Sequence, residues 1–219
     1  MAGGMRGFDP SLTRRGRLDT EGRIIIAHHL ILYSYGPLFP KGSGGGPQEA
    51  IPREKPADFG AGHVAGKHGR SPQSKLHALR NQARRPSEFP LLWFDEAKRR
   101  AVGAGFAEVV RRRRYTVWAC AVLENCAHLC VRTHRDSSQA MWHEFAEESQ
   151  SRLRLFADVA DNHPIWSEWL CVISLCTPGD VCRAVVHIGE NPAQENLPPQ
   201  AWPFVQPYDG WPYPKPLGK

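Results

Sequence analysis

Runs of apolar positions with distinct periods divide the chain into predicted strands and helices. Residues 22–36, GRIIIAHHLILYSYG, form a β-branched and aromatic run closed by glycine, which predicts a buried strand. Residues 115–124 and 127–132 predict two strands joined by a tight turn, and therefore an antiparallel hairpin. Residues 166–175, WSEWLCVISL, predict a further strand.

Apolar positions at helical spacing predict helices over residues 94–113, 137–156 and 179–190. We expect Asn191-Pro192 to end the last of these, because proline lacks the N–H that continues a helix. The resulting order is strand, helix, hairpin, helix, strand, helix. This order predicts an α+β fold of the ferredoxin-like or RRM-like kind, an antiparallel sheet with helices packed mainly on one face.

The periodic segments are separated by stretches of different composition. Residues 1–22 are polar and basic, and we predict that they are disordered. Residues 23–200 form the predicted domain, in which residues 37–72 are a Gly/Pro-rich insertion loop. Residues 201–219 form a tail too rich in proline for a helix or a central strand. Its aromatic side chains either cover the edge of the sheet or stack on unpaired bases.

Composition narrows the class of protein and of partner. The 219 residues carry a formal net charge of +6, which favours a polyanionic partner but does not require one. None of the six cysteines forms a C-x-x-C pair, which excludes the zinc-ribbon and thioredoxin patterns and favours reduced cysteines in a cytoplasmic protein. No stretch reaches the roughly 18 apolar residues of a membrane span, and the N-terminus has no signal-peptide core, so we expect no membrane partner.

Arginine side chains cluster before the predicted hairpin. If they share a face of the fold with the candidate site, they form a track for DNA phosphates. If they scatter, they are solubility charges, and the RRRR run is equally well explained as a solvated helix end favoured by the helix dipole. The candidate DNA-binding residues are Arg84, Arg85, Arg99, Arg100, Arg111, Arg112, Arg113 and Arg114.

The run ENCAHLCV, residues 124–131, carries the clearest candidate chemistry. Cys126 and His128 are two positions apart on a predicted strand, so their side chains point to the same face. The pair is either a metal site or part of the core, because buried cysteine often behaves as a small apolar residue. His28 and His29 precede the apolar centre of the first strand, and one of them could face the same site.

Several ordered motifs resemble those of the small single-tyrosine transposases, the insertion-sequence and REP-associated group. HHLILYSYGPLFPKGSGGG resembles the family's His-led opening strand and Gly-rich loop. YTVWACAVLENCAHLCVRTHRD resembles its central hairpin, whose second strand carries a His-hydrophobic-His motif. HIGENPAQENLPPQAWPFVQPYDGWP resembles its closing segment, a Tyr-Ile-x-x-Asn-Pro helix end with an aromatic tail. The resemblance extends from about Arg23 to Trp211.

This resemblance implies a metal-dependent reaction on DNA. In the family, two histidines on one strand face hold magnesium or manganese, which polarises the scissile phosphate of single-stranded DNA. A helix-borne tyrosine then attacks and leaves a 5′-phosphotyrosyl link. The partners that the resemblance implies are single-stranded or hairpin DNA and a second copy of the chain in a homodimer.

The sequence departs from the family pattern at two positions. His128 matches the second metal histidine, but Cys126 occupies the place of the first, and thiolate suits zinc better than magnesium. His187 occupies the place of the tyrosine, while Asn191 matches the family's asparagine. A phosphohistidine bond is too labile to store a DNA end in the same way. We therefore expect a transposase-like DNA-binding protein whose catalytic residues have eroded.

Two alternatives belong to other classes of protein. A non-enzymatic nucleic-acid-binding module would use the same sheet face and the basic helices, and its binding would be indifferent to divalent metal. A zinc-binding structural protein would use Cys126, His128 and a further cysteine or histidine.

Overall fold

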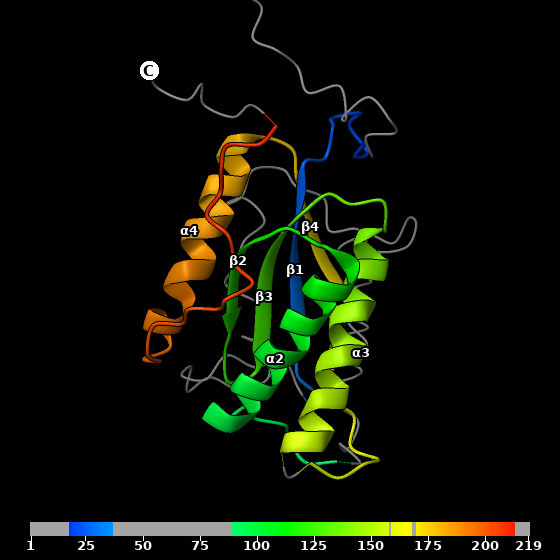
Figure 1. The fold of residues 1–219 in the computed structure, drawn as a ribbon, viewed down its shortest axis with the longest axis vertical. Coiled ribbons are helices and arrows are strands. Elements are labelled where there is room, and N and C mark those ends of the chain that lie inside the picture. The colour runs from blue at the N-terminus through cyan, green and yellow to red at the C-terminus, as the bar shows by residue number, and fades with distance from the viewer. Residues whose placement is uncertain (1–17, 37–88, 158, 168–169, 213–219) are drawn as a thin grey trace, which may run out of the picture.

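The computed structural model describes residues 18–36, 89–157, 159–167 and 170–212, and its centre is a four-stranded antiparallel sheet (Figure 1). The strands are β1 (Ala27–Tyr33), β2 (Val117–Val122), β3 (Cys126–Arg132) and β4 (Cys171–Leu175), in the spatial order β2-β3-β1-β4. The helices of the described residues are α2 (Glu96–Arg113), α3 (Ser138–Phe156) and α4 (Pro178–Gln194). The predicted α+β class and the antiparallel sheet are confirmed.

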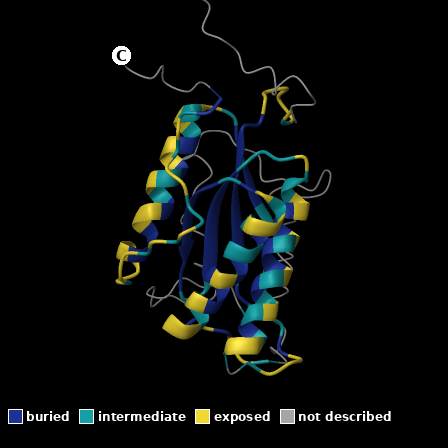
Figure 2. Cartoon of the chain, viewed as in Figure 1, coloured by how far each residue is buried: buried dark blue, intermediate teal, exposed yellow. Residues whose placement is uncertain are grey.

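The helices cover both faces of the sheet. Helices α2 and α3 pack against each other and on one face, and α4 packs on the opposite face, mainly over β2 and β3. Two of these helices therefore share a face as predicted, while α4 adds a third layer. Every residue of β2 is buried, and Figure 2 shows the sheet mostly dark blue. Strands that are apolar on both faces need a cover on both faces.

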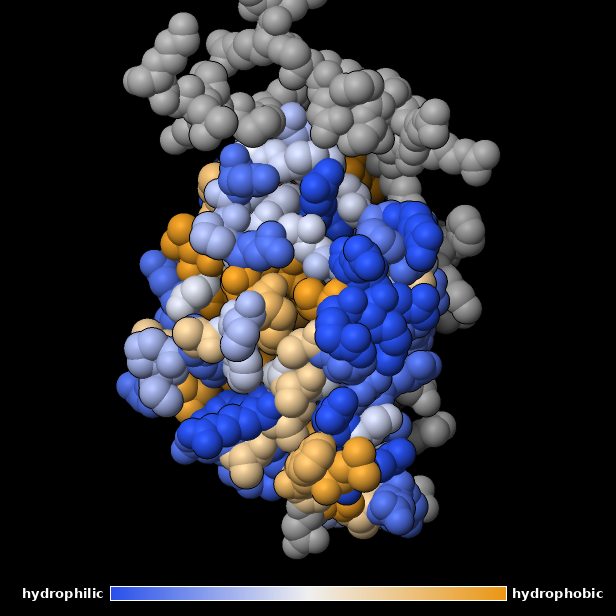
Figure 3. Space-filling model, viewed as in Figure 1, coloured by the Kyte–Doolittle hydropathy of each residue, from blue (hydrophilic) through white to orange (hydrophobic). Residues whose placement is uncertain are grey.

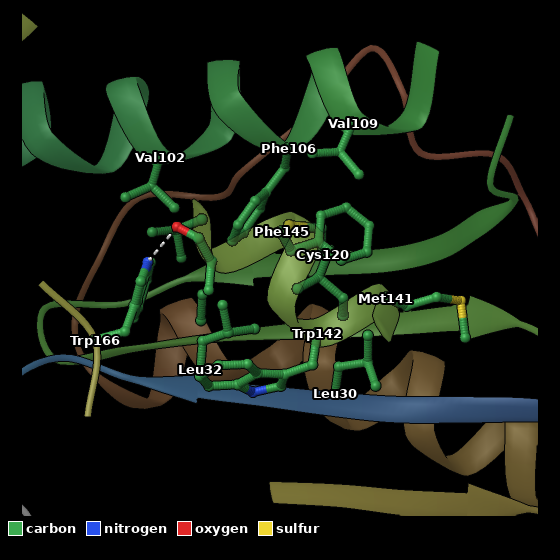
Figure 4. Packing of buried hydrophobic residues seen from close by; sticks show 14 of the residues in the cluster. Leu30, Leu32, Val102, Phe106, Val109, Cys120, Met141, Trp142, Phe145 and Trp166 are labelled. Atoms are coloured by element: carbon green, nitrogen blue, oxygen red, sulfur yellow. Dashed lines mark hydrogen bonds between the residues drawn. The ribbon is translucent and has the colours of Figure 1, made fainter. Parts of the chain in front are cut away.

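The core beneath α2 and α3 is aromatic (Figure 4). Phe106 of α2 meets Phe145 of α3 edge to face, with ring centroids 5.3 Å apart. Trp166 closes the end of this layer, and its Nε1–H donates to the carbonyl oxygen of Ala146 at 3.1 Å. The indole is therefore buried with its polar group satisfied, which makes Trp166 a structural residue.

Most element boundaries follow the predicted ones closely. Asp95 and Ser137 cap α2 and α3, each by accepting a hydrogen bond from the backbone N–H three residues later. The prediction that the last helix ends at Asn191-Pro192 is wrong, because α4 continues to Gln194 with Pro192 inside it. Proline removes only its own N–H, and so near a helix end the final turn can still form.

The strands β1 and β4 are shorter than the predicted ranges 22–36 and 166–175. At the start of the latter range, Trp166 forms only an isolated bridge to Ser34, and the regular strand begins at Cys171. The side chain of Trp166 instead packs with the helices, as its hydrogen bond to α3 requires. Tertiary packing has overridden local strand propensity here.

The C-terminal segment runs along the edge strand β2 (red in Figure 1). Val205 forms a parallel bridge with β2, and the side-chain amide of Gln200 donates to the Val122 carbonyl at 2.7 Å and accepts from its N–H at 2.9 Å. Trp211 is only 8% exposed. The described part of the tail therefore covers the sheet edge, while Tyr213 lies outside the described residues.

Other parts of the predicted organisation also fall outside the described residues. These are most of the 1–22 segment, the whole 37–72 loop, and both Arg84 and Arg85. Within the described part of the chain, no helix combines the length and the hydropathy needed to cross a bilayer.

Candidate functional site

Strand β3 presents Cys126 and His128 together on the sheet face that α4 covers. Cys126 and Cys130 belong to the apolar layer beneath α4, while Ala127 and Leu129 belong to the layer beneath α2 and α3. The Sγ atom of Cys126 lies 3.4 Å from Nε2 of His128. The predicted pairing of these two side chains is therefore present in the structure.

Strand β1 supplies a second histidine. Nε2 of His29 lies 3.0 Å from Nδ1 of His128, and the two residues are 0% and 3% exposed. The β1–β3 register places Ile31 opposite His128, so the two imidazoles meet diagonally across the strands. Alternation along β1 turns His28 to the other face, which settles which of the two adjacent histidines faces the site.

Helix α4 brings a third imidazole to the same place. The ring centroid of His187 lies 6.2 Å from the centroids of both His29 and His128. His187 is half-buried, and the neighbouring Ile188 is fully buried against the sheet. We call Cys126, His128, His29 and His187 the thiol–imidazole cluster; it brings together three of the residues that the sequence analysis singled out, Cys126, His128 and His187.

Asn191 lies one helical turn beyond His187, on the same side of α4. It is 5% exposed, and among the described residues its Nδ2 atom has no hydrogen-bond partner. Most buried amide groups in proteins are hydrogen-bonded. This helix face therefore carries, one turn from His187, a buried N–H donor without a partner among the described residues.

One arrangement of protons satisfies both contacts of His128. If Nδ1–H of His128 donates to Nε2 of His29, the other nitrogen of His128 is left as an acceptor for the Cys126 thiol. Both ring nitrogens of His128 then have partners from the protein. His128 is held between Cys126 of its own strand and His29 of the adjacent strand, and these two contacts fix the orientation of its ring.

The donor set of the cluster does not fit magnesium or manganese. Both ions favour oxygen ligands, and the thiol of Cys126 is a soft donor that suits zinc better. His128 in addition uses both of its nitrogens in contacts with Cys126 and His29. Across the described ranges, no group of three or more His, Cys, Asp or Glu side chains is arranged to hold a metal ion. Zinc binding by Cys126 and His128 stays a prediction.

Helix α2 and its arginines lie on the opposite face of the sheet from the cluster. Arg112 pairs with Glu144 at 3.1 Å and with Glu148 at 2.8 Å, and Arg113 also pairs with Glu144. The hydrogen bond from Arg113 is the main cause of a lowered pKa at Glu144. These ion pairs contribute to the hydrophilic surface over α3 in Figure 3.

The remaining arginine candidates of α2 have local roles as well. Arg111 pairs with Glu108, Arg100 pairs with Glu96, Arg99 donates to the Phe94 carbonyl, and Arg114 is the left-handed C-cap of the helix. The arginines of α2 thus do not share a face with the cluster. Phosphate binding by them stays a prediction, and it would have to compete with the ion pairs.

Comparison with known proteins gave little beyond this geometry. No protein-family model matches the chain, and no curated protein matches it. The chain is similar to the solved structure of a REP-associated tyrosine transposase bound to a REP hairpin. The TM-score is 0.40 and the identity 14%, over 83% of this chain and 77% of the other. A likeness at this level adds nothing about the site or its chemistry.

Proposed function

We propose that the protein binds single-stranded or hairpin DNA as a transposase-like protein that has lost the phosphotyrosine reaction. The observation that supports this proposal is the meeting of Cys126, His128 and His187 at one point of the fold. The family resemblance assigns the metal pair and the nucleophile to these three positions. His187 is far from Cys126 and His128 in the sequence. If the motifs matched by accident, there would be no reason for the three side chains to lie together.

The chemistry of the cluster supports loss of the ancestral reaction. Position 187 holds an imidazole, whose bond to phosphorus is labile, in place of a phenol that forms a stable phosphodiester. Position 126 holds a thiol, which is a poor ligand for a hard cation. Neither the metal-polarised phosphate nor the tyrosyl intermediate is then available, so binding without normal strand transfer is the expected activity.

The site does not depend on a second subunit. His187 meets His29 and His128 of its own chain, so α4 completes the cluster within one protomer. The homodimer that the family resemblance implies is therefore not needed for the proposal, and sedimentation of the purified chain tests it separately.

A binding experiment with labelled hairpin and single-stranded DNA tests the proposal. We expect retardation of the DNA that weakens steeply as salt is raised, because a chain with net charge +6 binds phosphates by releasing counterions. We expect the same affinity with magnesium and with a chelator. Matched duplex DNA serves as the control for preference. Failure to bind at low salt would refute the proposed function.

A covalent assay tests the loss of strand transfer. We expect no protein–DNA adduct from the natural chain after incubation with DNA and magnesium or manganese. The double variant Cys126→His, His187→Tyr restores the family residues, and a gain of adduct in this variant would support the residue mapping. An adduct formed by the natural chain would contradict the claim of erosion.

A further inference from the structure

We propose that Arg132, the last residue of β3, binds a phosphate group of the DNA backbone directly through its guanidinium. This inference rests on the proposed DNA binding and adds to it a contact for the DNA backbone. The family resemblance assigns no role to Arg132, and the residue lies outside the arginine cluster that precedes the hairpin.

Strand β3 carries Arg132 on the same face of the sheet as the thiol–imidazole cluster. Side chains two residues apart on a strand share a face, so Arg132 points to the same side as Cys130 and His128. Trp211, which Arg132 contacts, belongs with Cys130 to the apolar layer beneath α4. At about 3.3 Å per residue, Arg132 lies about 13 Å along the strand from His128. A DNA strand that reaches the cluster can therefore also reach this guanidinium.

The guanidinium of Arg132 is held by its flat side. Its Cζ atom lies over the ring of Trp211, 3.9 Å from the ring centroid. The N–H donors of a guanidinium lie at the edge of its plane, where two of them can bind both oxygens of a phosphate. The contact with Trp211 therefore orients the group and leaves its edge for an anion.

The ring of Trp211 is itself fixed in place. Its backbone N–H donates to the carboxylate of Asp209 at 3.0 Å, and its carbonyl accepts from the hydroxyl of Tyr208 at 2.6 Å. Its ring centroid lies 6.4 Å from that of Trp118 on β2. A donor that is already oriented binds with a smaller loss of conformational entropy than a long side chain that moves freely in solvent.

The charge of Arg132 is not neutralised by the protein. Within the described ranges, Arg132 forms no ion pair with a carboxylate, and Asp209 binds the backbone of Trp211 instead. In contrast, Arg112 and Arg113 both pair with glutamates of α3. The positive charge of Arg132 is therefore available to an external anion.

Arg114 adds a second positive charge at the same end of the sheet. It is exposed, and in the part of the chain that the structure describes it also forms no ion pair. It precedes Thr116 by two residues, and the Thr116 carbonyl accepts the backbone N–H of Arg132 at 3.0 Å. Asp136, a carboxylate at this end, already accepts from the Tyr115 hydroxyl at 2.8 Å. Two such arginines favour a polyanion over a single small anion.

The experiment measures binding of labelled hairpin DNA to the full chain at a series of salt concentrations. Arg132→Gln should weaken binding roughly tenfold, and the slope of log K against log salt should become shallower by about 0.7–0.9, because one phosphate contact is lost. The matched control is Arg152→Gln, which removes one charge from α3 on the opposite face, where Arg152 pairs with Glu148 at 3.4 Å. The control should leave the slope unchanged.

A second measurement uses only the natural chain. Phenylglyoxal modifies arginine side chains, and peptide mass spectrometry follows the rate at each position. Bound hairpin DNA should slow the modification of Arg132 and leave the rate at Arg152 unchanged. This measurement does not depend on the folding of a variant.

Equal affinity and equal salt slope for Arg132→Gln and Arg152→Gln would overturn the phosphate contact and leave the proposed function standing. Weaker binding of Arg132→Gln at an unchanged slope would assign Arg132 a structural role and would overturn it as well. So would modification of Arg132 at the same rate with and without DNA. Failure of the natural chain to bind hairpin or single-stranded DNA would refute both the proposed function and this inference.

Discussion

At the scale of single residues, two features together identify which histidine of β1 contacts His128. They are the direction in which its side chain points and the register of β1 against β3. Alternation separates His28 from His29, but it does not say which strand will lie alongside. The pairing of Ile31 with His128 brings His29 within 3.0 Å of the neighbouring imidazole. A buried polar pair of this kind stabilises the fold only while both members are present.

We predict that His29 and His128 are thermodynamically coupled. Either single change to leucine should lower the free energy of unfolding by about 1–3 kcal/mol, because the remaining imidazole loses a buried partner. The double variant should be more stable than the sum of the single effects by about 1 kcal/mol or more. Urea unfolding of the four proteins measures this. His128→Leu combined with Cys182→Ala, at an exposed site, should be additive; additivity of the histidine pair would contradict the prediction.

At the scale of elements, α2 and α3 approach closely because a residue without a side chain lies at their contact. A Cβ atom on Gly105 would lie 2.5 Å from the backbone Cα of Ser149. Glycine lowers the intrinsic stability of α2, and close packing with α3 offsets that loss. The ion pairs of Arg112 and Arg113 with Glu144 then join the exposed sides of the same two helices.

We predict that Gly105→Ala destabilises the protein by about 1–3 kcal/mol, because the added methyl group forces two helix backbones apart. Thermal unfolding followed by circular dichroism measures the effect. The matched control is Gly189→Ala in α4, where an added Cβ has no atom within 4 Å. That control should gain up to about 1 kcal/mol from helix propensity. Equal stabilisation by both changes would show that the helices do not touch at Gly105.

At the scale of the whole molecule, the described residues form three layers, with the sheet between α2 and α3 on one side and α4 on the other. The C-terminal segment covers the edge strand β2. Exposed strand edges invite pairing with other chains, and covering them prevents this. Gln200 and Val205 occupy the backbone groups of β2, while Trp202 packs so closely on α2 that a Cβ at Gly103 would lie 2.0 Å from its ring. The described part of the tail is therefore packed against the rest of the fold.

We predict that removing residues 201–219 lowers stability by several kcal/mol. A fully buried large side chain contributes about 1.5–3 kcal/mol, and the deletion removes the buried Trp211, the partly buried Trp202 and the Val205 bridge. The truncated protein should also associate through the uncovered strand β2, which light scattering detects. A shorter truncation after Pro212 keeps every described contact and is the control. Equal unfolding midpoints for both truncations would contradict the prediction.

The sequence by itself determined the local features of this protein. The period of the apolar positions fixed the order and type of the described elements, and period-two alternation placed Cys126 and His128 on one face, because both patterns depend only on neighbours along the chain. The same local reasoning stopped the last helix too early at Pro192, because a proline near a helix end still allows the final turn, which here continues to Gln194.

Only the tertiary structure decided which distant residues meet. Three features depend on how separate elements dock. Helix α4 forms a third layer, His187 lies beside His29, and arginines of α2 pair with carboxylates of α3. Docking is set by strand register and by complementary packing between segments far apart in sequence. No local pattern encodes those contacts, and the thiol–imidazole cluster exists only because of them.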